Sequence, residues 1–202
     1  MSIKCSVFIA TSVDGFISRH DGSIDWLMKV NSLVPEGEDG GYKSFIASVD
    51  GLIMGRHSFE QVLSFDEWPY GTLPVIVMSS KGVNIPKHLQ NYVSSSSESP
   101  TALVQRLANQ GMKHLYIDGG ITIQKFIAEH LIDELTITLI PVLLGSGRSL
   151  FGPLKEDVEL ELLETKNIGC GIVQLKYCIH STNTLHNKTY STKDVDGTVS
   201  FV

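Results

Sequence analysis

Short apolar runs alternate with helical patterns along most of the chain. Five runs have the length and composition of buried strands, at residues 5–10, 52–54, 75–78, 115–117 and 135–140. Apolar residues at helical spacing occupy several of the intervals between them. This alternation predicts a layered α/β domain whose strands are mostly parallel.

Two helices are marked by their ends as well as by their apolar stripes. Ser99 is a cap residue followed by Pro100 at the first helical position, and Gly111 follows the last periodic position. The buried stripe of this helix consists of Leu103, Val104, Leu107 and Ala108. A second helix is predicted over residues 121–131, with Ile123, Phe126, Ile127 and Leu131 on its buried face.

The C-terminal third predicts an antiparallel hairpin. Strand-like runs at residues 158–165 and 172–179 flank a glycine-bearing turn at 167–171. The sheet is therefore predicted to be mixed, mainly parallel with this hairpin at one side. Residues 31–41 and the serine run 94–97 are predicted loops.

Length and composition indicate one domain. The chain has 202 residues, of which 42% are hydrophobic, which suits a single core over residues 1–180. Residues 181–202 are polar and lack a sustained period, so we expect a separate polar tail there.

Charge and cysteine content exclude several partners. The net charge is -6, and the 16 basic residues form no cluster, which argues against nucleic acid. The N-terminus has neither a signal peptide nor a spanning segment, so we expect a cytoplasmic protein without a membrane partner. Neither the three cysteines nor the seven histidines have metal-ligand spacing, so no metal is expected.

The segment GLIMGRHSFE, residues 51–60, passes from a buried strand through Gly55 into a helix that begins with Arg56 and His57. Free backbone N–H groups and a guanidinium at such a junction suit a phosphate. Ser79, Ser80 and Lys81 follow the strand at 75–78, where open α/β sheets usually bind ligands. These donors could hold a second phosphate.

A third junction joins the strand at 115–117 to Asp118, Gly119, Gly120 and a helix. Two glycines allow the backbone to approach a ligand closely, at the positive end of that helix. Junctions of this kind are common as simple turns. Their occurrence three times, in order, in one small domain favours a dinucleotide site.

The segments MGRHSFE (54–60), VIVMSS (75–80) and YIDGGITIQKFI (116–127) resemble the three cofactor-binding segments of dihydrofolate reductases. Together with ATSVDGFIS (10–18), they resemble more closely the reductase domain of the bifunctional riboflavin-biosynthesis deaminase-reductase. The resemblance extends from about residue 3 to 179. It implies a dihydrofolate reductase-like three-layer fold, NADPH as cofactor and the activity of a 5-amino-6-(5-phosphoribosylamino)uracil reductase-like enzyme.

The resemblance also assigns cofactor contacts. It implies that the nicotinamide is lined by Ala10, Gly15 and Ile17, that the phosphates meet Gly55, Arg56, His57 and Ser58, that the adenosine end meets Ser79 and Ser80, and that the pyrophosphate is held by Gly119, Gly120, Ile121 and Thr122. Charge-assisted bonds from Arg56 and Lys81 agree with a 2′-phosphate, which favours NADPH over NADH.

The segment GSGRSLFG, residues 145–152, is not a Rossmann fingerprint, because its third glycine comes late and Pro153 blocks a following helix. The longer segment from Pro141 to Phe151 resembles the family's glycine loop after its strand, and it could form a wall of the active site. A wide surface turn is the alternative.

Asp14 and Asp25 are the candidates for proton handling, since hydride reduction of an imine or carbonyl requires a proton at the adjoining heteroatom. The structural alternatives are a turn residue for Asp14 and a helix cap for Asp25. Trp26 and Phe45 are candidates for contacting a flat acceptor. Lys29, Val30 and Asn31 stand where dihydrofolate reductases carry their pterin-binding carboxylate, which argues against folate reduction.

Three functions are consistent with these observations. The first is an NADPH-dependent reductase of a pyrimidine or pterin-like heterocycle, without a deaminase domain because the zinc signature of that domain is missing. The second is a weak dihydrofolate reductase. The third is a catalytically silent NADPH-binding sensor or scaffold. The resemblance further implies a homodimer, for which the C-terminal hairpin could form the interface.

Overall fold

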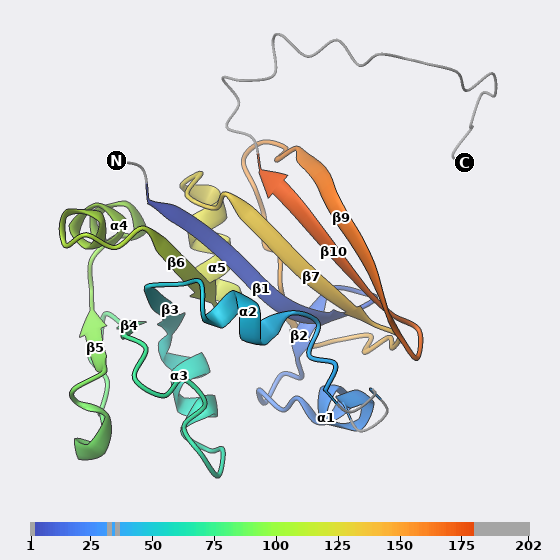
Figure 1. The fold of residues 1–202 in the computed structure, drawn as a ribbon, viewed down its shortest axis with the longest axis horizontal. Coiled ribbons are helices and arrows are strands. Elements are labelled where there is room, and N and C mark those ends of the chain that lie inside the picture. Colours follow the sequence, from blue (N-terminus) through green and yellow to red (C-terminus); the bar gives the residue numbers. More distant parts are fainter. Residues whose placement is uncertain (1–2, 32–33, 35–36, 180–202) are drawn as a thin grey trace, which may run out of the picture.

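The computed structural model describes residues 3–31, 34 and 37–179, and the predicted tail at 181–202 lies outside them. One sheet of eight strands has the order β5-β4-β3-β6-β1-β7-β10-β9 (Figure 1). Its strands are β1 (Lys4–Ser12), β3 (Gly51–Gly55), β4 (Val75–Met78), β5 (Val93–Ser96), β6 (His114–Asp118), β7 (Glu134–Ile140), β9 (Leu160–Gly169) and β10 (Ile172–Ile179).

The mixed sheet predicted from the sequence is confirmed. Parallel pairs connect β5, β4, β3, β6, β1 and β7, whereas β10 pairs antiparallel with both β7 and β9. Cys170 and Gly171 form the tight turn between β9 and β10, with φ angles of 52° and 78°. Two consecutive residues with positive φ are typical of a hairpin turn whose twist matches its strands.

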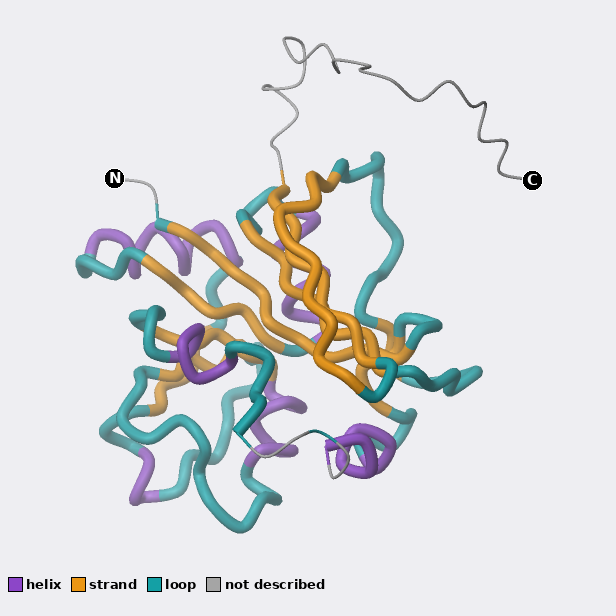
Figure 2. Tube along the Cα trace, turned by 45° about the vertical axis from the view of Figure 1, so that its right-hand side comes forward, coloured by secondary structure: helices purple, strands orange, loops and turns teal. Residues whose placement is uncertain are grey.

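Helices lie on both faces of the sheet (Figures 1 and 2). They are α1 (Asp25–Asn31), α2 (Tyr42–Ile46), α3 (Arg56–Val62), α4 (Pro100–Asn109), α5 (Gly120–Ala128) and the 3-10 helix η1 (Lys87–Leu89). The predicted cap of α4 is present, because Ser99 Oγ accepts the Ala102 N–H at 3.3 Å. None of the helices in the described ranges is long and apolar enough to span a membrane.

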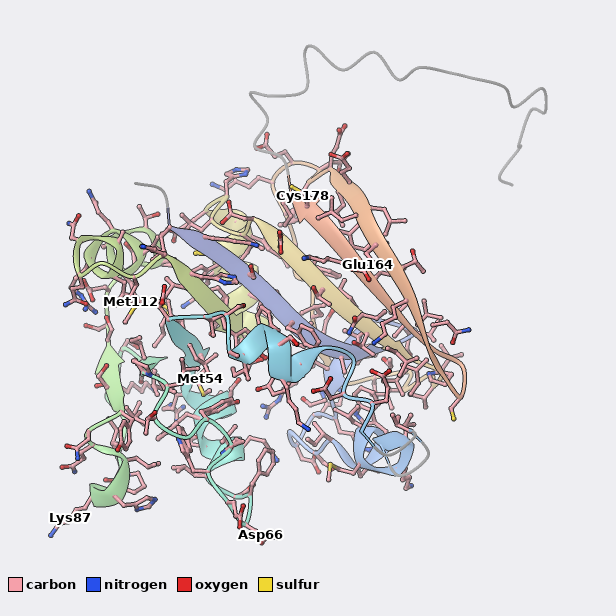
Figure 3. The ribbon with its side chains drawn as sticks, in the orientation of Figure 1. Met54, Asp66, Lys87, Met112, Glu164 and Cys178 are labelled. Carbon is pink, nitrogen blue, oxygen red and sulfur yellow. The ribbon has the colours of Figure 1, made fainter. Side chains whose placement is uncertain are left out.

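Alternating side chains of the central strands divide the core between the two faces. Ile53 belongs to the cluster that packs under α4 and α5, together with Leu103 and Phe126. Its neighbours Leu52 and Met54 belong to the cluster on the α2 and α3 side. In Figure 3, Met54 marks this central position in β3, just before the turn into α3.

The serine run was predicted to be a loop, and this is wrong. Residues 93–96 form β5, the last strand at one side of the sheet, paired only with β4. Ser94 and Ser95 are exposed. Because an edge strand of this kind is held by backbone hydrogen bonds, polar side chains on it do not prevent pairing.

The helix predicted over 121–131 ends earlier, at Ala128. His130 has a φ of 54°, which no helix accommodates. Leu131 nevertheless packs against the core cluster under α4 and α5, so the apolar position that extended the predicted helix belongs to the loop before β7.

A second, small sheet was not anticipated. It pairs β2 (Phe16–Ser18) with β8 (Arg148–Ser149). This pair joins the segment after β1 to the glycine-bearing loop after β7. Both segments therefore meet beside the carboxyl end of β1.

Candidate functional site

A cleft of about 950 Å³ lies at the carboxyl ends of the parallel strands. The turns after β3, β4 and β6 all line it, together with β2 and β8. These are the three junctions that the sequence predicted to carry phosphate contacts. Since β4, β3, β6 and β1 are neighbours in the sheet, their carboxyl ends meet at one edge, where open α/β sheets bind ligands.

The turns approach one another so closely that two glycines are required. Gly119 has a φ of 85°, and a Cβ on it would collide with Ser58 Oγ. A Cβ on Gly55 would stand 3.0 Å from Thr122 Oγ1. The floor of the cleft is thus formed by backbone, which leaves N–H groups free to face a ligand.

Basic side chains stand along the rim of the cleft. Arg56 donates to Glu60 Oε1 at 2.9 Å, and His57 lies 3.2 Å from Glu60 Oε2. Lys81 and Arg148 are exposed lining residues without ion pairs within the described part of the chain. This positive rim suits the phosphates of a dinucleotide.

The cleft brings together nearly all of the sequence-predicted cofactor residues. Those lining it are Ala10, Ile17, Gly55, Arg56, His57, Ser58, Ser79, Ser80, Gly119, Gly120, Ile121 and Thr122. Gly15 does not line it. The glycine floor and the basic rim fit a ligand that carries a pyrophosphate and a further phosphate.

One part of the cleft lining consists of Phe8, Tyr70, Tyr116 and Asp118, and Asp118 is the acid among these four residues. Asp118 ends β6 immediately before the Gly119 turn. Its carboxyl contacts the Tyr116 hydroxyl, which donates to the Phe8 carbonyl at 2.9 Å. Tyr42 and Tyr70 lie within electrostatic range of the same carboxyl.

Burial raises the pKa of Asp118 to about 6, although the Gly119 N–H and the Tyr116 hydroxyl lower it in part. A carboxyl with a pKa near 6 that lines a cleft has the property required of a proton donor or acceptor. The motifs of the sequence did not single out Asp118 as an acid. The available signal was its position, since it is the carboxylate directly at the carboxyl end of a central strand.

Asp14 lies outside the cleft and holds two segments together. It accepts Ser12 Oγ at 2.6 Å, the Leu144 N–H at 3.1 Å and the Gly145 N–H at 2.7 Å. The Ser12 hydroxyl, with these backbone donors, holds the pKa of Asp14 below its usual value. The carboxylate is therefore engaged in fixing the loop after β7 against the segment after β1.

Asp25 is also outside the cleft. It forms a two-bond ion pair with Arg19, at 2.6 Å and 3.0 Å, and stands in the first turn of α1. The Arg19 guanidinium lowers the pKa of Asp25 to about 2. A carboxylate held ionised in this way is a poor proton donor near neutral pH.

The two aromatic residues expected at the acceptor belong to the core. Trp26 is buried against Ile140 and Ile172, and its Nε1 has no hydrogen-bond partner among the described residues. Phe45 stacks on Phe8 at 5.0 Å and meets the edge of Tyr116. Phe45 thus packs against two residues that line the cleft, Phe8 and Tyr116. Neither Phe45 nor Trp26 is itself among the lining residues.

Comparisons with known proteins agree with this geometry. The sequence model of the RibD C-terminal domain matches residues 4–174. YwjB from Bacillus subtilis (strain 168) is 38% identical over 181 residues, covering 88% of this chain and 98% of YwjB.

Solved structures share the fold. A Shewanella sp. PV-4 protein named for riboflavin biosynthesis superposes with a TM-score of 0.82 and 37% identity, over 89% of this chain and 100% of that one. Dihydrofolate reductase from Enterococcus faecalis, solved with NADP(H), gives a TM-score of 0.60 with 16% identity, over 88% of this chain and 97% of that one. The predicted dihydrofolate reductase-like fold is confirmed.

Proposed function

Because the chain belongs to the RibD C-terminal domain family, a family of riboflavin-biosynthesis-type reductases, we propose that it is an NADPH-dependent reductase of a small nitrogen heterocycle. One observation carries the proposal. The three glycine-bearing and serine-bearing turns converge on a single cleft, and Asp118 is one of its lining residues.

The cofactor, when bound, supplies the hydride. The chain's own residues would bind and orient it: the rim residues Arg56 and Lys81 would neutralise phosphate charge, and the Gly119 and Gly55 floor would admit the pyrophosphate. We expect NADPH to bind more tightly than NADH. The positive charges and hydrogen-bond donors of the side chains at this position match a 2′-phosphate better than a ribose hydroxyl; these residues are Arg56, Ser79, Ser80 and Lys81.

Asp118 is our candidate for the proton, in place of Asp14 and Asp25. Reduction of a C=N group places the hydride on carbon and a proton on nitrogen, which gives CH–NH. Asp118 would carry that proton to the nitrogen and regain one from solvent, while Tyr116 would keep the carboxyl oriented. The apolar lining residues Leu27 and Val62 would reduce the amount of water that the cleft holds when a ligand is bound.

Substitution of the three acids distinguishes these assignments. Asp118→Asn is expected to lower kcat by about 100-fold or more, the usual contribution of a positioned acid, with NADPH affinity changed by less than about three-fold. Asp14→Asn and Asp25→Asn should keep kcat within about ten-fold. The measurement is steady-state NADPH oxidation with a panel of pterins and pyrimidines, alongside NADPH titration by calorimetry.

Three results would contradict the proposal. Loss of turnover in Asp25→Asn but not in Asp118→Asn would show that Asp25, in α1, is the proton donor. Absence of NADPH binding would refute the proposed reductase activity. NADPH binding without oxidation by any acceptor would support a sensor or scaffold instead.

We also propose that the protein is a homodimer that uses the C-terminal hairpin. β9 is the last strand at its side of the sheet, and Leu160, Leu162 and Leu163 on it are 41%, 53% and 49% exposed. Exposed apolar side chains on an unpaired strand edge favour association with a second copy.

A further inference from the structure

One side of the cleft is formed by two segments that lie far apart in the chain. These are β2 and β8, which pair antiparallel with each other. Their lining residues are Ile17, Ser18, Arg148 and Ser149. We refer to β2 and β8, together with Leu150, as the side wall.

The side wall is attached to the ends of β1 and β7. The Leu150 N–H donates to the Gly15 carbonyl at 2.9 Å. Just before β8, the Gly145 N–H donates to the Asp14 carboxylate at 2.7 Å. These bonds connect the segment after β1 to the loop after β7, and neither of them involves the turns after β3, β4 and β6.

A second attachment comes from α5, which begins at the turn after β6. The Gln124 side-chain amide donates to the Ser149 carbonyl at 3.1 Å and to the Leu150 carbonyl at 3.2 Å. Gln124 also lines the cleft, about one helical turn after Gly120. A side-chain amide has two N–H donors, so this one residue can hold two consecutive carbonyls of the side wall.

The turn after β6 also contacts the side wall directly. A Cβ on Gly120 would stand 2.9 Å from Ile17 Cδ1 and 3.0 Å from the Ser149 carbonyl oxygen. Contact this close leaves no space for a side chain at Gly120. Because packed groups cannot interpenetrate, a shift of this turn toward the side wall displaces β2 or β8 as well.

We propose that Gln124 is a positioning residue, which makes the order of the side wall depend on a dinucleotide seated against the turn after β6. The inference rests on the proposed function, because the seated ligand is NADP(H). Gln124 acts through the Ser149 and Leu150 carbonyls rather than on the reacting atoms. By linkage, a side wall ordered in this way tightens NADP(H) binding in return.

The surroundings of Gln124 distinguish this role from a general contribution to stability. Its side chain is half-buried and belongs to the cleft lining rather than to the core. Leu150, by contrast, is fully buried and fixes its end of the side wall without the amide. Loss of the amide should therefore loosen Arg148 and Ser149 locally and leave the fold intact.

Hydrogen exchange tests the proposal without an acceptor. The full chain is measured by hydrogen-exchange mass spectrometry with and without saturating NADP⁺, and NADP⁺ binding is measured separately by calorimetry. In the unsubstituted chain, NADP⁺ is expected to slow exchange at least about ten-fold at residues 55–59, in the turn after β3, and at residues 148–150.

Two substitutions remove the bonds in different ways. Gln124→Glu removes the amide donors at nearly constant size, and Gln124→Asn keeps an amide but shortens its reach by one methylene. In both variants the slowing at residues 148–150 is expected to fall below about three-fold, while the slowing at 55–59 persists. The control Gln105→Glu makes the same replacement at an exposed position of α4 and should retain both effects.

Several results would overturn the inference while NADP⁺ still binds. They are the absence of slowing at residues 148–150 in the unsubstituted chain, its survival in either folded variant, and an equal loss of slowing at residues 55–59. Failure of both variants to fold, measured by thermal unfolding without nucleotide, would overturn it too, because Gln124 would then be required for the fold. Absence of NADP⁺ binding to the unsubstituted chain would instead refute the proposed function.

Discussion

Arg56 forms an ion pair within α3 and also lines the cleft. Its guanidinium bonds to Glu60 one turn along α3, at 2.9 Å, and 38% of the side chain is exposed. A surface pair of this kind contributes little to stability. The guanidinium can therefore turn to a phosphate at small cost.

Arg56→Ala is expected to weaken NADPH binding by about 1.5 to 3 kcal/mol, the range for hydrogen bonds to charged groups, and to leave NADH nearly unchanged. Calorimetric titration of both nucleotides measures the difference. Equal losses for the two would show that Arg56 does not contact the 2′-phosphate.

Asp118 makes folding stability depend on pH. Its pKa is about 6 in the folded protein and near 3.9 in an unfolded chain, so the folded state holds the proton more tightly between these values. The stability that this group contributes is complete below the unfolded pKa and is lost as pH rises through about 6.

Asp118→Asn should accordingly stabilise the protein at pH 8, by up to about 3 kcal/mol if the whole shift is realised, and should have little effect near pH 4. Urea unfolding at both pH values measures this, with Asp157→Asn as the control. A stabilised but inactive variant would separate the role of Asp118 in the reaction from a role in folding. Destabilisation at pH 8 would contradict the raised pKa.

At the scale of elements, the turns after β3 and β6 pack against each other, so the conformation of one constrains that of the other. Ser58 in α3 occupies the space beside Gly119, and Thr122 in α5 occupies the space beside Gly55. Each turn therefore fixes the other, and both helices begin at the same cleft.

Gly119→Ala is expected to destabilise the protein by more than about 1 kcal/mol, since the new Cβ collides with Ser58 Oγ and the residue keeps a positive φ. NADPH affinity should fall at least about ten-fold because the turns are forced apart. Thermal unfolding and calorimetry test this. Gly82→Ala is a control for backbone strain alone, because its φ is 72° and its Cβ position is open.

At the scale of the whole molecule, the sheet has two different sides. β5 ends one side as a short strand with serines, whereas β9 ends the other as a strand of ten residues with exposed leucines. The second edge is long enough to pair with or pack against another copy.

Leu162→Lys is expected to convert a dimer into a monomer, because it places a charge on that edge with little effect on the fold. Sedimentation velocity at several concentrations measures the change, and Leu143→Lys, at a 72% exposed position in the loop after β7, is the control. A monomer in the unsubstituted chain would refute the proposed homodimer.

The sequence by itself determined most of the local elements and indicated the turns that line the cleft. The strand at Val75–Met78 was predicted with its observed bounds, and the capped helix α4 begins where Ser99 and Pro100 indicate. The periodicity of buried positions and the residue preferences of turns depend on a few neighbouring residues, so both can be recognised within a single segment. β5 was not predicted because three of its four residues are serines, which leave no apolar pattern, and backbone pairing with β4 holds the strand.

The tertiary structure alone shows that Asp118, rather than Asp14 or Asp25, lines the cleft. Asp14 and Asp25 have the composition expected of a proton donor, but backbone N–H groups and Arg19 engage them. The raised pKa of Asp118 depends on the order of β3, β6 and β1, which buries the carboxyl near tyrosines from distant segments. No basic side chain is among the groups that shift this pKa. Its environment depends on contacts between elements far apart in the chain, and no local pattern encodes these contacts.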